Sequence, residues 1–195
     1  KHIRTLQDMP VELLEHTLGK MGSSIWRKAN GIDNHPVVQY NERKSISTER
    51  TFDRDTIDMI KMRAILSAMA ENLAYQLRRA GKVCACVTVK IRYSDFQTKT
   101  LQKHIPYSAA DHEIIPLVLE LFERIYDRRV LIRLIGIRLS HLVSGSYQMS
   151  LFADDTKYAE LYQAMDKIRN RFGDRSIMRA AGMEARTIGR SNPFN

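Results

Sequence analysis

Hydrophobic and polar residues between positions 43 and 146 form a pattern that predicts the order strand, helix, strand, strand, helix, strand. The sharpest strand signal is Val83–Tyr93, where apolar residues occupy every second position. Amphipathic helices are predicted at about Thr56–Arg79 and Asp111–Tyr126, since their apolar residues recur three and four positions apart. The remaining strands are predicted at Lys44–Phe52, Gln97–Ile105 and Val130–Leu142.

This order of elements is typical of the α+β class with a ferredoxin-like split βαβ (βαββαβ) fold. In that fold both helices cover one face of a four-stranded antiparallel sheet, and the other face is left open. Gly81 is expected to end the first helix and Pro106 to end the third strand. The inward face of the first helix is expected to consist of Ile57, Ile60, Ala64, Ile65, Ala68, Leu73 and Leu77. That of the second helix is expected to consist of Ile114, Leu117, Val118, Leu121, Phe122 and Ile125.

The segments on either side of this domain differ from it in pattern. Residues 1–35 predict a small all-helical piece, residues 36–42 a linker, and residues 147–195 a tail. The tail begins with the short apolar motif QMSLF at 148–152 and continues as an amphipathic helix, Lys157–Phe172, that either packs on the domain or binds a partner. The last stretch, from Arg175 onward, is expected to be a weakly anchored basic end. The inward residues of the tail helix are predicted to be Tyr158, Leu161, Tyr162, Met165, Ile168 and Phe172.

Glycines divide the first helical piece into short helices. Ser23 or Ser24 is expected to cap a helix at Ile25–Ala29, which ends at Gly31. Two short helices around a turn at Gly22 and Ser23 would present backbone N–H groups at a helix start, an arrangement that suits a phosphate. The alternative is an ordinary helical corner.

Charge adds a candidate partner to this picture. The chain has 195 residues, a net charge of +9 and a pI near 9.7, which favours a polyanion. The predicted strands and their ends carry only two acidic residues, Glu49 and Asp95. Their basic residues are Arg43, Lys44, Arg50, Lys82, Lys90, Arg92, Lys99, Lys103, Arg128, Arg129, Arg133 and Arg138. The second predicted helix is acidic. This separation of sign favours a phosphate backbone lying along the strands.

Individual strand positions refine that hypothesis. Lys90 and Arg92 fall on the polar side of the second strand. Arg133 and Arg138 have opposite parity, so they share a face only if the fourth strand is bulged, and Gly136 is the expected site of the bulge.

Several classes of protein and site are disfavoured by the sequence. No run approaches the length of a membrane span, so we expect a cytoplasmic protein without a membrane partner. Cys84 and Cys86 stand in an apolar run and are interpreted as reduced packing residues. The histidines show no ligand spacing, and Asp154 and Asp155 are interpreted as solvated charge or a helix cap. We therefore expect no catalytic residue and no metal site in this chain.

Three separated stretches resemble, in the right order, the carboxy-terminal half of the Y-family translesion DNA polymerases. LGKMGSSIWRKANGID at 18–33 is similar to the later part of their thumb domain. RKSISTERTF at 43–52 and VLIRLIGIRLSHL at 130–142 resemble the first and last strands of their little finger, and QMSLF at 148–152 resembles their clamp-binding pentapeptide. Because the chain starts at Lys1 without an initiating Met, we expect it to be a piece of a longer protein.

The resemblance implies a role for particular residues. The little finger of the family grips double-stranded primer-template DNA through phosphates, and the pentapeptide binds the bacterial sliding clamp. Leu134 stands where some members have a second arginine beside Arg133. The DNA contacts implied are Gly22, Ser23, Ser45, Ser47, Arg133 and Arg138, to which the parity argument adds Lys90 and Arg92. The clamp contacts implied are Gln148, Met149, Leu151 and Phe152.

The resemblance also implies what this chain does not contain. In the family, palm carboxylates hold the Mg²⁺ ions of nucleotidyl transfer, so the full-length parent would be a DNA-directed DNA polymerase of repair and damage tolerance. This piece would be inactive alone, without a cofactor of its own, and is not expected to form an oligomer. One alternative is a non-catalytic accessory module that binds DNA or the clamp. Another is a ferredoxin-like RNA-binding module, which is disfavoured because the open side of Val83–Tyr93 carries no aromatic residue for stacking bases.

Overall fold

The computed structural model describes residues 2–37, 42–145, 156–174 and 176–187. The chain divides into two compact units, residues 1–42 and 43–195, and each is described by itself. The motif at 148–152 lies outside the described residues. No described helix is long and apolar enough to cross a membrane.

The first unit contains three short helices, α1 (Ile3–Gln7), α2 (Val11–Leu18) and α3 (Lys20–Ala29). The prediction of a helix start at Ser23 or Ser24 is wrong, because α3 already begins at Lys20, after Gly19 at φ 60°. Gly31, at φ 73°, follows the end of α3 as predicted.

Gly22 lies inside α3 and lets the helix approach α2 closely. A Cβ built on Gly22 would stand 2.1 Å from the carbonyl oxygen of Leu14, and both residues are buried. The N–H of Gly22 donates to the carbonyl of Gly19 at 2.8 Å. Gly22 is thus required by helix packing, and its N–H already has an acceptor.

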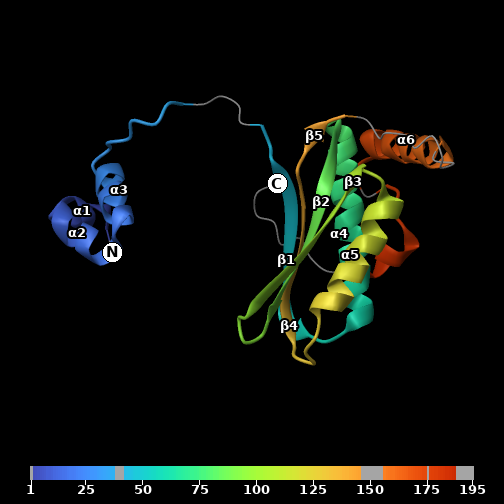
Figure 1. Cartoon of the computed structure of the whole chain (residues 1–195), viewed down its shortest axis with the longest axis horizontal. Coiled ribbons are helices and arrows are strands. Elements are labelled where there is room, and N and C mark those ends of the chain that lie inside the picture. The colour runs from blue at the N-terminus through green and yellow to red at the C-terminus, as the bar shows by residue number, and fades with distance from the viewer. Residues whose placement is uncertain (1, 38–41, 146–155, 175, 188–195) are drawn as a thin grey trace. The chain divides into compact units, whose positions relative to one another are not determined.

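The second unit follows the predicted order of elements, and its α+β class is confirmed. Two helices, α4 (Met59–Arg79) and α5 (Asp111–Ile125), lie on the same face of an antiparallel sheet (Figure 1). The main strands, in the spatial order β1-β4-β2-β3, are β1 (Ser45–Thr56), β4 (Ile132–Ser140), β2 (Lys82–Tyr93) and β3 (Thr98–Ser108), while β5 (Val143–Ser144) pairs with β2. The strands β1 and β2 that flank α4 are split by β4, so the predicted split βαβ arrangement is confirmed.

The core lies between the sheet and the two helices. All six residues that α5 was expected to turn inward are buried, namely Ile114, Leu117, Val118, Leu121, Phe122 and Ile125. For α4 the expected face is partly wrong, because Ile57 and Ile60 are 58% and 73% exposed. The helix begins only at Met59, after the N-cap Asp58, so Ile57 precedes it. Ile65, Leu73 and Leu77 are buried as expected, and Met62 and Leu66 are buried in addition. Gly81, at φ 59°, follows the helix end as predicted.

One strand prediction fails because of sheet position. Pro106 does not end β3, which continues to Ser108. β3 lies at the sheet edge, and its register with β2 is irregular between the residues that pair with Cys84 and Cys86. Pro106 falls in this irregular stretch, where its missing N–H removes no hydrogen bond between the strands. The two cysteines are free and buried, as expected. Cys84 belongs to the core, and burial raises the pKa of its thiol to about 12.

The bulge expected in β4 exists, but not at Gly136. On β2, Arg92 pairs with Leu134 and the next residue, Tyr93, pairs with Ile132, so Arg133 is the additional residue. Pairing is continuous on both sides of Gly136.

The described part of the tail packs on the helix layer, so for residues 176–187 the expectation of a weakly anchored end is wrong. Residues 188–195 lie outside the described residues. Helix α6 (Thr156–Phe172) and the 3₁₀ helix η1 (Ala180–Thr187) follow the sheet domain. The backbone N–H of Arg179 donates to Glu71 of α4 at 3.3 Å, and a Cβ on Gly182 would lie 3.2 Å from Ala68.

The buried side of α6 also differs from the prediction. Tyr162 and Met165 are buried as expected, but Tyr158, Leu161, Ile168 and Phe172 are 43%, 47%, 39% and 67% exposed. Arg169 takes their place on the inward side, because its charge is satisfied there by a carboxylate of α4.

Candidate nucleic-acid interface

The sheet face turned away from α4 and α5, called the open face below, is built from cross-strand rows of residues. Residues that pair directly across strands lie on the same face, so the register defines each row. No helix in the described part of the second unit covers this face (Figure 1). The rows are Ser45–Ser140–Cys86–His104, Ser47–Arg138–Thr88–Gln102, Glu49–Gly136–Lys90–Thr100 and Thr51–Leu134–Arg92–Thr98.

The chemistry of the open face is hydroxylic and cationic. Serine and threonine hydroxyls surround the cations Arg138, Lys90 and Arg92, and none of the residues in the rows is Phe, Tyr or Trp. Such a face offers hydrogen-bond donors and positive charge to phosphate, and the imidazole of His104 is the one ring in its rows on which a base could stack.

Lys90 meets a carboxylate across the neighbouring strand. Its Nζ donates to the two carboxylate oxygens of Glu49 at 2.9 and 3.1 Å. Gly136 stands between them in the row, and an added Cβ there would lie 2.8 Å from Cγ of Glu49. A glycine at this position therefore leaves room for an ion pair that crosses β4, and part of the charge of Lys90 is neutralised.

The two arginines in the rows differ in how tightly they are held. Arg92 donates from Nε to the hydroxyl of Thr98 at 2.9 Å, which fixes its side chain along the sheet. Arg138 is exposed, and no ion pair or hydrogen bond joins its side chain to another described residue. The hydroxyls of Ser47 and Thr88 flank Arg138 in its row. Arg138 is thus the cation of this face most available to a ligand.

Arg133 lies at the end of the sheet where β2 turns into β3. Its Nη1 is 3.8 Å from Asp55, and its guanidinium is 4.9 Å from the ring centroid of Phe96. A cation over an aromatic ring is attracted by the electrons of the ring face. These contacts orient Arg133 and leave its side chain 42% exposed.

Three of the basic residues counted with the sheet do not belong to the open face. Lys99 and Lys103 have the opposite parity in β3, and they form ion pairs with Asp127 and Glu120 at the end of and within α5. The hydrogen bond from Lys99 lowers the pKa of Asp127. Arg50 pairs across strands with the core residue Ile135. Part of the predicted separation between basic strands and an acidic helix is therefore a set of ion pairs between β3 and the region of α5.

The remaining predicted residues fall in three places. Ser45 and Ser47 are in rows of the open face, half-buried and exposed. Gly22 is buried in the first unit. The predicted clamp residues Gln148, Met149, Leu151 and Phe152 lie outside the described residues.

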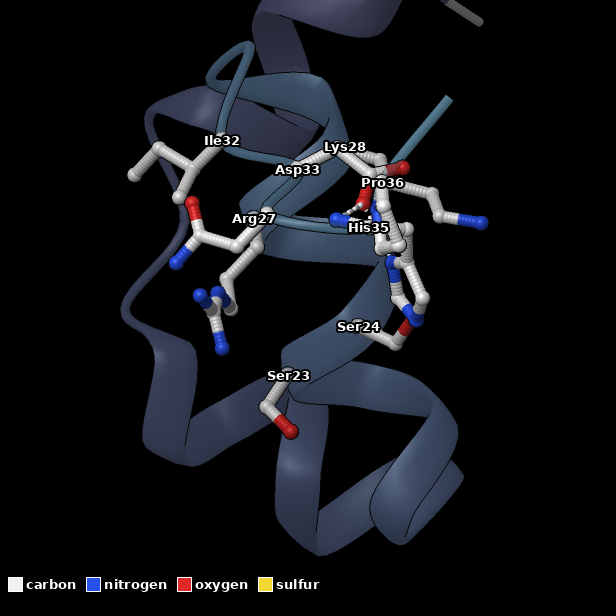
Figure 2. A pocket seen from close by; sticks show the side chains of 9 residues that line it. Ser23, Ser24, Arg27, Lys28, Ile32, Asp33, His35 and Pro36 are labelled. Carbon is white, nitrogen blue, oxygen red and sulfur yellow. Dashed lines mark hydrogen bonds and ion pairs between the residues drawn. The ribbon is translucent and has the colours of Figure 1, made fainter. Parts of the chain in front are cut away.

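Ser23 lines a groove in the first unit with a volume of about 380 Å³ (Figure 2). Arg27 and Lys28 contribute two cations to this groove, and Ser24 contributes a second hydroxyl. Asp33 accepts a hydrogen bond from the backbone N–H of His35 at 3.0 Å, which holds the loop on the other side. The groove thus offers the hydroxyls and cations of α3 side chains to a ligand, whereas Gly22 is buried and its N–H already donates to Gly19.

One cluster on the open face is invisible in the sequence. Cys86, His104 and His141 place their ligand atoms within 4.8 Å of one another. They come from different strands, so their spacing along the chain carries no signal.

Comparison with known proteins identifies the family. The model of the impB/mucB/samB family C-terminal domain matches residues 43–151. The chain belongs to this family. The resemblance to Y-family polymerases is thereby confirmed, and the matched domain is the unit that carries the open face.

Curated relatives of this family member are named DNA polymerase IV. The protein of Clostridium acetobutylicum is 37% identical over 191 residues, covering 94% of this chain and 48% of that protein. The protein of Dehalococcoides mccartyi strain CBDB1 is 35% identical, covering 88% and 45%. DNA polymerase IV 2 of Bacillus subtilis is 32% identical, covering 92% and 45%. The chain spans about half the length of the curated relatives it matches.

Proposed function

We propose that this chain is the DNA-gripping and clamp-recruiting portion of a translesion DNA polymerase. The observation that carries the proposal is the open face, whose rows combine hydroxyls and cations and contain no Phe, Tyr or Trp. The names of the curated relatives support a polymerase as the whole protein.

Phosphates of double-stranded primer-template DNA are the ligands of the open face in this proposal. The row with Arg138 at its centre offers one phosphate a guanidinium flanked by the hydroxyls of Ser47 and Thr88. Most side chains of the face are short, so they reach the backbone of a duplex better than the base edges within a groove. Binding is therefore independent of sequence and steeply dependent on salt.

The groove of the first unit supplies a second phosphate contact. Ser23, Arg27 and Lys28 are its donors, on consecutive turns of α3. A second contact on a separate unit would lengthen the grip on the duplex and raise the number of counterions released.

The chemistry of nucleotidyl transfer belongs, in this proposal, to the half of the relatives' length that this chain does not span. Carboxylates there would hold the Mg²⁺ ions that activate the primer hydroxyl. This chain alone would bind DNA without extending a primer.

The experiment that tests the grip is duplex binding at several salt concentrations, followed by fluorescence anisotropy. The double variant Arg92→Ala, Arg138→Ala should reduce the slope of log affinity against log salt by about 2. The matched control, Lys99→Ala with Lys103→Ala, removes the same charge from the helix-covered side and should leave the slope nearly unchanged. A slope near zero in the native chain, or equal losses in the two double variants, would contradict the proposal.

Recruitment to a bacterial sliding clamp rests on residues 148–152, between β5 and α6. Leu151 and Phe152 would enter an apolar groove of the clamp, and Gln148 would hydrogen-bond beside it. Calorimetric titration of the chain with the clamp should show binding that a Leu151→Ala, Phe152→Ala double change abolishes. Equal binding by both chains, or none by the native chain, would reject this part of the proposal.

A further inference from the structure

Three residues with metal-binding side chains meet at one end of the open face. Cys86 of β2 pairs directly with His104 of β3 on one side and with Ser140 of β4 on the other. His141 follows Ser140 where β4 ends. The three potential ligands therefore come from two adjacent strands and from the residue that follows a third, although Cys86 and His141 are 55 positions apart in the chain.

The distances between the ligand atoms are close to those of a metal centre. All three atoms lie within 4.8 Å of one another, and the two imidazole centroids are 5.1 Å apart. Zn–S and Zn–N bonds of about 2.3 and 2.0 Å place the ligand atoms of a tetrahedral site roughly 3.3–3.7 Å apart. Rotation of the two exposed imidazoles can supply the remaining ångström, whereas Cys86 is buried and held in the strand.

The backbone at His141 places its ring beside that of His104. His141 has φ 55°, in the left-handed region, where few residues other than Gly, Asn, Asp and His are found. Among the described residues, neither imidazole forms a hydrogen bond or an ion pair, and each contacts the other's ring. Both rings thus keep their nitrogens available to a ligand.

We propose that Cys86, His104 and His141 bind a transition-metal ion of the Zn²⁺ class. One thiolate and two imidazoles are the donors that such ions prefer, and they are poor ligands for Mg²⁺ or Ca²⁺. When the metal–sulfur bond forms, the thiol of Cys86 releases its proton to water. Three protein ligands leave the fourth tetrahedral position to water or to an anion.

Bound metal would change the charge of the open face. The site belongs to the row that begins at Ser45, so a dication there would add positive charge beside the phosphates. This consequence rests on the proposed function, while metal binding itself does not. The test therefore contains no DNA, and its outcome is independent of that of the duplex titration.

The test is titration of the reduced, metal-free chain with Co²⁺, followed by absorption. One equivalent should produce a thiolate-to-cobalt charge-transfer band and the visible bands of a tetrahedral ion, and Zn²⁺ should displace both. His104→Gln and His141→Asn should each weaken binding by at least about tenfold, since loss of even an outer-shell partner costs that much. Asn is suitable at 141 because it tolerates the left-handed backbone.

Matched controls separate a built site from scattered thiols and imidazoles. Cys84→Ala and His16→Gln remove the same types of side chain elsewhere and should leave the affinity unchanged. Cys86→Ser should abolish the charge-transfer band, and if that buried change prevents folding, the two exposed histidine variants decide the matter. Absence of the band in the native chain, or equal affinities in the histidine variants and the controls, would overturn the proposal.

Discussion

Arginines on the two sides of the second unit have opposite surroundings. Arg138, on the open face, is exposed and has no ionic partner among the described residues. Arg169, in the helix layer, is 3% exposed, and its guanidinium pairs with Glu71 of α4. Both residues lie in elements predicted from the sequence, and nothing in their local pattern distinguishes a binding residue from a structural one.

The helix layer contains a second cation, half-buried, that is also held by carboxylates. Arg78 of α4 donates to Asp111 of α5 and to Asp166 of α6, each at 2.7 Å. Burial alone would lower the pKa of Arg78, but the two carboxylates outweigh it and raise the pKa above its ordinary value. This network joins three helices and attaches the tail to the domain.

The difference between these arginines shows that burial decides whether a charged side chain is part of the fold or is available to bind a ligand. A buried ion pair contributes little net stability, yet removal of one partner is costly because the other is left charged and desolvated. An exposed cation without a partner contributes little to folding and remains free to bind a phosphate. Three predictions test this contrast, from the largest expected effect to the smallest.

The largest effect is expected from Arg169→Ala, which leaves Glu71 buried without its cation. The free energy of unfolding should fall by about 3–5 kcal/mol. Urea unfolding followed by circular dichroism measures it, while fluorescence of Trp26, the single tryptophan and part of the first unit, should keep its native midpoint. Arg171→Ala, an exposed change two residues along α6, is the control and should cost no more than about 0.5 kcal/mol.

A double change sharpens the same measurement. Arg169→Met with Glu71→Leu removes both charges and keeps the volume, so most of the lost stability should return. If the double variant is as unstable as Arg169→Ala, packing rather than the unpaired carboxylate is responsible.

The opposite result is expected for Arg138→Ala. The free energy of unfolding should change by less than about 0.5 kcal/mol, because no described contact is lost. Duplex affinity at about 0.15 M salt should fall roughly fivefold, as expected for the loss of one phosphate contact. Anisotropy and urea unfolding on the same sample measure both, and a loss of stability without a loss of affinity would reverse the assignment of the two sides.

The smallest effect is expected from Glu49→Gln, which releases Lys90 from its ion pair on the open face. Duplex affinity should rise by about 0.5 kcal/mol, or slightly more than twofold, because one more cation becomes available. Glu120→Gln, which releases Lys103 on the helix-covered side, is the matched control and should leave the affinity unchanged. Unchanged or weaker binding of Glu49→Gln would show that Lys90 does not face the phosphates.

Much of the fold was predictable from local periodicity. The inward face of α5 was predicted correctly because this helix packs on one side only. The inward face of α6 was predicted wrongly, since an arginine buried against a distant carboxylate has the same local signature as a solvated one. Pro106 was likewise misjudged, because its effect depends on whether the strand lies at an edge.

The candidate site also contains residues that the sequence placed correctly and residues that it could not place. Alternation in β2 was sufficient to assign Lys90 and Arg92 to the polar side, and the register confirms that they share the open face with Arg138. No local signal could place Lys99 and Lys103 beside the acids of α5, or bring Cys86 together with its two histidines.

By itself, then, the sequence determined the α+β class, the order of elements and the family to which the chain belongs. The class and the order follow from hydrophobic periodicity, because a strand or helix that is buried on one side has apolar residues at regular intervals. Only the tertiary structure decided which charges are neutralised, which residue is the additional one in β4 and which side of the tail is buried. Those features depend on partners far apart along the chain. A periodic pattern indicates that a residue is buried, but it does not indicate which residue packs against it.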